Sequence, residues 1–290
     1  MLYQEHTLNE NRKSGKFRLY IQDPDISFGK TRERPFILIC PGGGYMFRAT
    51  KEGEAMALHF LAKGYHVGVL EYQTYLKDRR NLADINTNLQ FEDIYLDMLD
   101  AMLYLKSHQK EWFIQENQIF AMGFSAGGHL SAYLATHWHD QAFVAKHYPN
   151  HSPEDFKPAG VILGYPLINY SALRATESAV SDDNLIALKT ILEGIDENLS
   201  DCVSEKTVPV FLFHTGEDDV TLATESLDFI AQLQKYQIPC EFHLFETGRH
   251  GLALANETHA VTSDDVKEGY RDWTHLADIW MHERIRRMKK

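Results

Sequence analysis

The sequence predicts an α/β protein with a central, mostly parallel β-sheet, and three observations lead to that class. Short, continuous apolar runs such as PFILIC at residues 35–40 are typical of strands that are buried on both faces of a sheet. These runs alternate with segments that repeat apolar residues at helical spacing, which indicates βα units. The 290 residues contain no internal repeat or low-complexity linker, so we expect a single domain over residues 1–290 with helices flanking the sheet.

The periodic segments give the expected elements in order. Strands are expected at residues 17–21, 35–40, 66–71, 118–123, 159–164, 208–214 and 241–246. We interpret the first strand as a hairpin partner for the second. Helices are expected at residues 52–63, 91–105, 126–137, 222–236 and 270–288, and Gly64 follows the first helix where glycine commonly ends one. In the helix at 222–236, the spacing places Leu227, Ile230 and Leu233 on the inner face.

Residues 165–207 interrupt this alternation. The segment is rich in Ser, Asp, Glu and Asn and contains no long strand, and it is longer than a typical connection between elements. We therefore expect an insertion with short helices of its own. It is either a plain surface excursion or a lid over a site, and its position in the strand order favours a lid.

Charge and composition exclude several classes of protein. The chain has 29 basic and 41 acidic residues, a net charge of −12, so nucleic acid is not an expected partner. The cysteines Cys40, Cys202 and Cys240 are too few and too widely spaced for a disulfide framework or a cysteine metal site. Residues 1–18 are polar, and the apolar run at 36–40 ends at Pro41, so we expect no signal peptide, no membrane partner and a cytoplasmic location. Association with further copies of the chain is left open.

A G-x-S-x-G pattern lies between an expected strand and an expected helix, at Gly123–Gly127. In that context the serine occupies a sharp turn, and small residues on either side let strand and helix approach closely. The following helix N-terminus offers backbone N–H groups to a developing negative charge. We therefore expect Ser125 to be a nucleophile. The alternatives are a tightly packed glycine turn and a phosphate loop, and the second lacks the required Lys.

Three consecutive glycines, Gly42 to Gly44, follow the strand at 35–40. Such a run is entropically costly and commonly provides a special backbone path. We expect an oxyanion hole formed by the N–H groups of Gly43, Gly44 and Ala126. A flexible loop tip is the structural alternative, while the spacing does not fit a dinucleotide-binding loop.

An acid and a base are expected after two later strands. His250 lies between glycines after the strand at 241–246, and Asp218 follows the strand at 208–214. Carboxyl ends of parallel strands are where open α/β sheets place their sites. Asp218 is favoured over the adjacent Asp219, and Glu217 is a third candidate. His137 and His139 form only a weak metal-binding pattern.

These motifs together resemble a known family. PGGGY, EYQTY, GFSAGG, HTGEDD and GRHGL, in this order between about residues 35 and 254, resemble the α/β-hydrolase esterases. Among these, the motifs look most like the small intracellular acetylesterases that are grouped with acetyl xylan esterase-like (lipase/esterase) proteins and dienelactone hydrolase-like proteins. The resemblance implies the α/β-hydrolase fold and a triad of Ser125, Asp218 and His250, in the chain order typical of that fold. Two departures are Pro41, where the lipase-like pattern has His, and Tyr72-Gln73, where a related branch has Tyr-Arg.

The expected function is that of a serine carboxylic-ester hydrolase. We expect an acyl-enzyme mechanism on short acyl esters, acetyl above all, with a sugar as a candidate alcohol and with no metal or organic cofactor. The partner is then a small-molecule ester, and Tyr45, Phe47 and Tyr165 are substrate-binding candidates that could equally be core residues. The alternatives are an arylformamidase-like amidase on the same fold and a non-catalytic hydrolase-fold binding protein.

Overall fold

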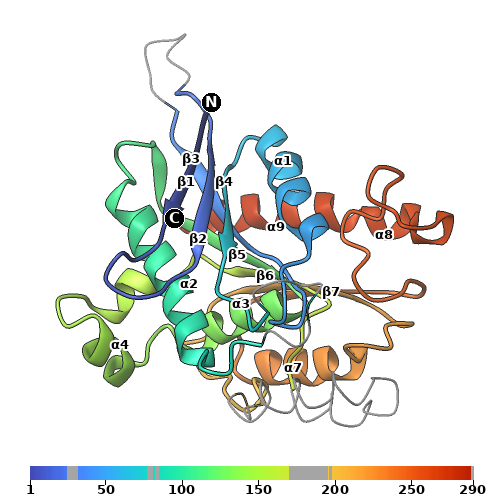
Figure 1. The fold of residues 1–290 in the computed structure, drawn as a ribbon. Coiled ribbons are helices and arrows are strands. Elements are labelled where there is room, and N and C mark those ends of the chain that lie inside the picture. Colours follow the sequence, from blue (N-terminus) through green and yellow to red (C-terminus); the bar gives the residue numbers. More distant parts are fainter. Residues whose placement is uncertain (25–31, 77–80, 82–84, 170–194, 196–197, 289–290) are drawn as a thin grey trace.

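The computed structural model describes residues 1–24, 32–76, 81, 85–169, 195 and 198–288, and its centre is an eight-stranded sheet. The strands are β1 (Leu2–Thr7), β2 (Lys16–Ile21), β3 (Arg34–Cys40), β4 (His66–Glu71), β5 (Ile114–Phe124), β6 (Val161–Gly164), β7 (Val210–Thr215) and β8 (Cys240–Phe245). Their order in the sheet is β1-β2-β4-β3-β5-β6-β7-β8. The strands from β4 to β8 are parallel, and β2 is antiparallel to both of its neighbours. The expected mostly parallel sheet is confirmed (Figure 1).

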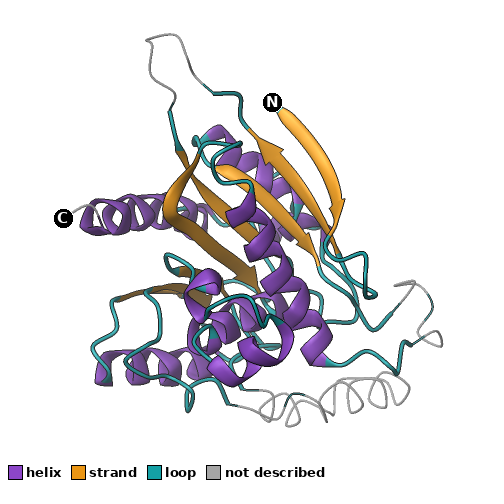
Figure 2. Cartoon of the chain, turned by 90° about the vertical axis from the view of Figure 1, so that its left-hand side faces the viewer, coloured by secondary structure: helices purple, strands orange, loops and turns teal. Residues whose placement is uncertain are grey.

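Helices cover both faces of this sheet (Figure 2). The α-helices are α1 (Glu54–Ala62), α2 (Phe91–Ser107), α3 (Ala126–His137), α4 (Gln141–His147), α7 (Ala223–Lys235), α8 (Glu268–Arg271) and α9 (Trp273–Met288), and short 3-10 turns are η1 (Thr50–Glu52), η2 (Pro153–Phe156) and η4 (Ser263–Asp265). Residues of α2, α3 and α7 share one buried cluster with Leu38 of β3, while residues of α1 and α9 share the other with Ile37 and Ile39. Adjacent residues of one strand thus face two cores, which explains its continuous apolar sequence.

Two expectations about the elements were wrong. The strand at 17–21 does not form a hairpin with the strand at 35–40, because β2 pairs with β1 on one side and β4 on the other. In α7, Leu227 is 44% exposed, and the inner face is formed by Ser226, Phe229 and Leu233. Leu233 faces the core as predicted and Ile230 packs against it, so only Leu227 was wrongly placed.

The carboxyl ends of β3, β5, β6, β7 and β8 lie at one edge of the sheet because these strands are parallel. The loops that follow them carry the predicted site residues. Of the segment at 165–207, residues 170–194 and 196–197 lie outside the described residues, so the predicted lid does as well. The described ends of the segment meet in a bridge between Asn169 and Asn198.

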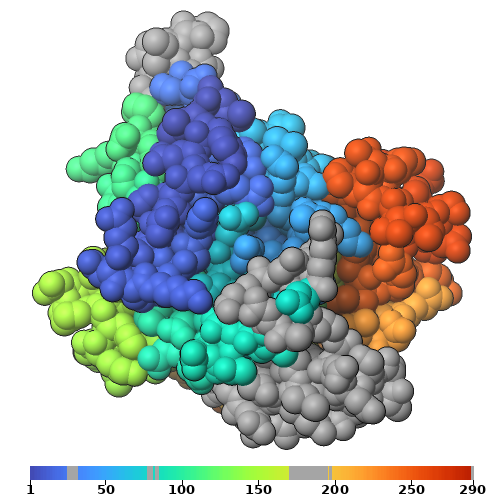
Figure 3. All heavy atoms as spheres, in the orientation of Figure 1, coloured from blue at the N-terminus to red at the C-terminus, as the bar shows by residue number. Residues whose placement is uncertain are grey.

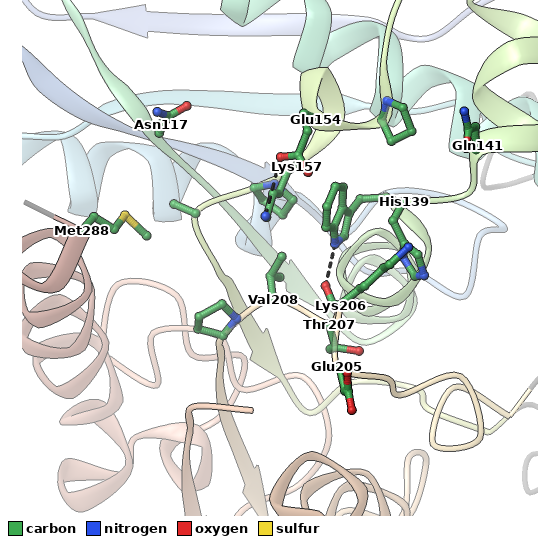
Figure 4. A pocket seen from close by; sticks show the side chains of 15 residues that line it. Asn117, His139, Gln141, Glu154, Lys157, Glu205, Lys206, Thr207, Val208 and Met288 are labelled. Carbon is green, nitrogen blue, oxygen red and sulfur yellow. Dashed lines mark hydrogen bonds and ion pairs between the residues drawn. The ribbon is translucent and has the colours of Figure 1, made fainter. Parts of the chain in front are cut away.

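A hollow of about 950 Å³ lies at the opposite edge, where β6 and β7 begin (Figure 4). Its lining includes Trp138, Lys157 and Val208. The ring of Trp138 is held in place, because its Nε1 donates to the carbonyl oxygen of Lys206 at 2.9 Å and Lys157 Nζ lies 4.5 Å from the ring centroid. None of the predicted site residues lines this hollow.

The chain between β8 and α9 forms a lobe beside α1, shown in orange and red in Figure 3. Trp273 of α9 packs against Phe60 of α1 and stacks on Phe213 of β7, with ring centroids 6.1 and 4.2 Å apart. This packing fixes the lobe to the core next to the loop that follows β8. In the described part of the chain, no helix has the length and apolar character needed to span a membrane.

Candidate active site

Ser125 lies on a sharp turn between β5 and α3, as the G-x-S-x-G pattern predicted. Its φ of 53° and ψ of −119° are unusual for a residue other than glycine, and its N–H donates to the carbonyl oxygen of Gly164 at 3.0 Å. A Cβ at Gly123 would lie 1.9 Å from the carbonyl oxygen of Gly127, and a Cβ at Gly127 would lie 2.0 Å from that of Cys40. Both distances are far shorter than a van der Waals contact, so this turn requires the two glycines.

One chain of hydrogen bonds connects the three residues expected to form a triad. Oγ of Ser125 is 2.9 Å from Nε2 of His250, and Nδ1 of His250 is 2.8 Å from Oδ2 of Asp218. Asp218 is 5% exposed, whereas the neighbouring Asp219 is open to solvent. The structure therefore places Asp218, and not Asp219, against the histidine.

The carboxylate of Asp218 is surrounded by donors. Oδ1 accepts the N–H groups of Val220 and Thr221 at 2.9 and 3.0 Å, and Oδ2 accepts the hydroxyl of Thr221 at 3.2 Å. Burial alone would raise the pKa of Asp218, but the hydrogen bonds from His214 and His250 and the charge of His250 hold it well below its usual range. Asp218 thus remains ionised and faces Nδ1 of His250.

His214, the histidine near the end of β7, is a member of this network that the sequence analysis did not assign to the site. It is fully buried, and its Nε2 lies 2.8 Å from the carbonyl oxygen of Thr221 and 3.3 Å from Oδ2 of Asp218. Because both neighbours are acceptors, Nε2 carries a proton, while Nδ1 is 2.8 Å from Oγ of Ser226. A histidine within an otherwise apolar buried strand was the sequence signal that could have identified it.

The loop after β3 has the special backbone path that its glycines predicted. Gly43 and Gly44 have φ values of 119° and 61°, in the region that favours glycine. The carbonyl oxygen of Gly43 accepts the N–H groups of Met46 and Phe47 at 3.0 and 3.2 Å, which closes the turn. A Cβ at Gly42 would lie 2.8 Å from Cβ of Ser125, so this loop runs directly beside the serine.

The backbone N–H groups of Gly43, Gly44 and Ala126 make no hydrogen bond to another described residue. The N–H of Gly42 is different, because it donates to Oε2 of Glu52 at 2.8 Å. The three unoccupied donors belong to the residues expected to form the oxyanion hole. An oxygen atom that gains negative charge beside Ser125 could accept hydrogen bonds from them.

The loop that carries His250 is held from two sides. Glu217 accepts the N–H of Gly248 at 2.8 Å, so this third acid candidate fixes the loop and does not face the histidine. Arg249 forms a two-pronged ion pair with Asp265, with Nε–Oδ1 and Nη2–Oδ2 distances of 2.6 and 2.7 Å. This geometry restricts the two residues that precede His250.

The structure corrects two of the three aromatic substrate-binding candidates. Tyr45 is fully buried, and its hydroxyl is 2.9 Å from Nδ1 of His129, so it is a core residue. Tyr165 is also buried, and its hydroxyl donates to Oε1 of Glu52 at 2.7 Å. Neither ring offers a free face to a sugar. Phe47 is 39% exposed and remains available to contact a substrate.

Glu52 is a second residue at the site that the sequence analysis did not identify. It is 2% exposed, although the local sequence KEGE resembles a solvated helix start. Glu54, two residues later, is exposed. Nothing in the local sequence distinguishes the two glutamates, because the partners of Glu52 are a backbone N–H of the glycine loop and a tyrosine 113 positions away.

Within the parts of the chain that the structure describes, no group of three or more His, Cys, Asp or Glu side chains is arranged to hold a metal ion. The pair His137 and His139 therefore has no third protein ligand there. His137 instead stacks on Tyr133, with ring centroids 3.9 Å apart.

The chain is similar to several known proteins. It is 30% identical over 260 residues to endo-1,4-beta-xylanase B of Butyrivibrio fibrisolvens, an alignment that covers 88% of this chain and 38% of that protein. The chain spans about two fifths of the length of the curated relatives that it matches.

Solved structures are similar over nearly the whole chain. MGS-M1, an α/β hydrolase from a Medee basin deep-sea metagenome library, is 30% identical with a TM-score of 0.74, and 98% of each chain is covered. The acetyl ester-xyloside bifunctional hydrolase of Caldicellulosiruptor lactoaceticus is 27% identical with a TM-score of 0.71, covering 97% of this chain and 96% of that one. These neighbours support the expected class of carboxylic ester hydrolase.

The family model BD-FAE matches residues 25–233, which include the serine turn, the glycine loop and Asp218. The strand order, the serine turn and the structural neighbours all agree with the fold that the motifs predicted. The chain therefore belongs to the BD-FAE family and has the α/β-hydrolase fold.

Proposed function

We propose that this chain is a serine carboxylic-ester hydrolase. The observation that carries the proposal is the unbroken series of hydrogen bonds from Ser125 through His250 to Asp218, beside three backbone N–H groups that have no hydrogen-bond partner among the described residues. A serine hydroxyl is a weak nucleophile until a neighbouring base removes its proton, and the 2.9 Å contact with Nε2 of His250 supplies that base.

The proposed reaction proceeds in two acyl transfers. Oγ of Ser125 attacks the ester carbonyl carbon while its proton moves to Nε2 of His250, and the carbonyl oxygen becomes an oxyanion that the N–H groups of Gly43, Gly44 and Ala126 stabilise. The tetrahedral intermediate releases the alcohol, which takes the proton from His250. Water then attacks the acyl-enzyme with His250 again as base. The second tetrahedral intermediate breaks the bond to Oγ of Ser125, which takes the proton back from His250 as the carboxylic acid leaves. Throughout, Asp218 orients the imidazole and stabilises its charged form.

We propose short acyl esters, acetyl above all, as the substrate class, with a sugar as the alcohol. The names of two similar proteins, a xylanase and an acetyl ester-xyloside hydrolase, support this choice. Phe47, beside the glycine loop, is the aromatic residue proposed to contact the sugar. It lines a hollow of about 230 Å³ together with Arg48 and Thr74.

A panel of acetyl, butyryl and octanoyl esters, with acetylated xylo-oligosaccharides, tests the proposal. We expect kcat/KM to be highest for acetyl, and Ser125→Ala to lower turnover by about 10⁴-fold or more without loss of the fold. Efficiency that peaks at octanoyl would contradict the acetyl preference. Faster turnover of a formanilide than of any ester would indicate an amidase, and a chain that a fluorophosphonate does not label at Ser125 would be a non-catalytic binding protein.

A further inference from the structure

Glu52 is a buried carboxylate at the end of η1, just beyond the glycine loop. Both of its oxygens accept hydrogen bonds, Oε2 from the N–H of Gly42 at 2.8 Å and Oε1 from the hydroxyl of Tyr165 at 2.7 Å. The mechanism above uses neither oxygen. Burial raises the pKa of Glu52, although the hydrogen bonds from Tyr165 and Gly42 oppose the shift. Burying a carboxylate costs desolvation free energy unless hydrogen-bond donors compensate it, so the role of Glu52 depends on what its two donors hold in place.

The first partner belongs to the loop of the proposed oxyanion hole. Gly42 directly precedes the donors Gly43 and Gly44, and its Cα lies so close to Ser125 that no Cβ would fit. The hydrogen bond to Glu52 fixes the peptide N–H of Gly42. The orientation of the next two N–H groups depends on this peptide, because they follow it along a short, tight turn.

The second partner connects Glu52 to the histidine. Tyr165 lies in the loop after β6, and its ring is edge-on to the ring of His250, with centroids 5.0 Å apart. The hydroxyl of Tyr165 also accepts the N–H of Ala253 at 3.3 Å, in the loop that carries His250. One carboxylate thus joins the loops after β3, β6 and β8, which hold the oxyanion donors, the tyrosine and the base.

We propose that Glu52 is a positioning residue that fixes the oxyanion loop relative to His250 through Gly42 and Tyr165. This inference rests on the proposed esterase function and deepens it. Stabilisation of a transition state depends on donors that are held within a few tenths of an ångström, and loss of one oxyanion donor costs roughly 10²–10³ in kcat. Displacement of two donors by a loosened loop should have an effect of similar size.

Three variants and one control test this role. Glu52→Ala removes both acceptors, and Glu52→Gln keeps an oxygen that can accept from Gly42. Tyr165→Phe removes the second bond together with the acceptor of the Ala253 N–H. Glu54→Gln is the control, because Glu54 is two residues away and exposed. For each variant, kcat and KM for an acetyl ester are measured well below the unfolding temperature, and kcat is expressed per Ser125 that a fluorophosphonate titrates. Unfolded protein then does not contribute to kcat.

We expect Glu52→Ala to lower kcat per titrated site by about 10²-fold with KM within about threefold of wild type. Glu52→Gln and Tyr165→Phe should lose less than about tenfold, and Glu54→Gln should match wild type. If Ser125→Ala is inactive and wild type is active, but Glu52→Ala and Glu52→Gln both keep a wild-type kcat per site, the inference is overturned and the proposed function stands. If wild type neither hydrolyses esters nor reacts with the fluorophosphonate, the proposed function fails and this inference fails with it.

Discussion

Asp218 and Asp219 are adjacent in the chain but lie in opposite environments. Asp218 is buried against His214 and His250, and its carboxylate accepts two backbone N–H groups, while Asp219 faces solvent. The same substitution at Asp218 and at Asp219 therefore tests whether Asp218 orients His250, with Asp219 as the matched control.

We expect Asp218→Asn to lower kcat by about 10⁴-fold, because an amide can donate to Nδ1 of His250 and would favour the wrong tautomer. Asp219→Asn should stay within about twofold of wild type. Steady-state kinetics on an acetyl ester, with circular dichroism to verify folding, measures both. An Asp219→Asn variant with the larger loss would refute the assignment of the acid.

Site residues that lie in a short sequence motif could be predicted from the sequence. Site residues whose role comes from being buried against distant parts of the chain could not. Ser125 and His250 lie in short glycine motifs that are visible in the chain. Glu52 and Tyr165 contact each other across 113 positions, so no local pattern connects them. Tyr45 follows the glycines directly, yet its ring turns inward to His129, a direction that sequence spacing does not reveal.

At the element scale, the turn from β5 into α3 depends on close backbone contact. Gly127→Ala should destabilise the protein by about 3 kcal/mol or more, because the new Cβ would meet the rigid backbone of β3 at Cys40. Urea unfolding gives the free-energy difference. Gly269→Ala in α8 is the control, since no atom lies within 4 Å of its added Cβ, and it should be neutral or slightly stabilising. Equal stability of the two variants would show that the turn can relax.

Four of the predicted strands, β3, β4, β6 and β7, are buried over most of their residues, whereas β8 is only half-buried. Continuous apolar runs identified β3, β4, β6 and β7 to within a few residues. β1 was missed because it is an edge strand whose residues are exposed or half-buried, so LYQEHT has no apolar run. The face of α7 was misjudged because small Ser226 is turned inward to meet His214, and an apolar stripe does not mark such a position.

At the scale of the whole molecule, the parallel sheet brings loops from distant parts of the chain to one edge, and the lobe after β8 secures the last of them. Asp265 in η4 accepts hydrogen bonds from Nε and Nη2 of Arg249 and from the N–H groups of Val261 and Thr262. The hydrogen bonds from Arg249 hold the pKa of Asp265 well below its usual range. Asp265 therefore links the lobe to the residue before His250.

A carboxyl group whose pKa is lower in the folded than in the unfolded state stabilises the fold above its unfolded pKa of about 3.9, and this contribution is lost as the pH falls below that value. We expect Asp265→Asn to lower Tm by roughly 2–6 °C at pH 7, corresponding to about 1–2 kcal/mol for a charge-assisted bond to a half-exposed Arg249. The Tm difference from wild type should be constant above about pH 5 and shrink below about pH 4.

Comparison of Asp265→Asn with a second variant separates the titration of Asp265 from the pH dependence of Tm that all variants share. The chain has a net charge of −12 at pH 7 and a pI of about 5.6, so acid first reduces its self-repulsion and then, below the pI, increases it through positive charge. Both effects change the Tm of every variant together. Asp264→Asn removes one negative charge from an exposed neighbour and should leave Tm near that of wild type across the same pH range. Scanning calorimetry from pH 3 to 7 on the three proteins measures the differences. A Tm gap for Asp265→Asn that stays the same at pH 3 and pH 7 would mean that the residue stabilises the lobe by packing alone, because packing does not titrate.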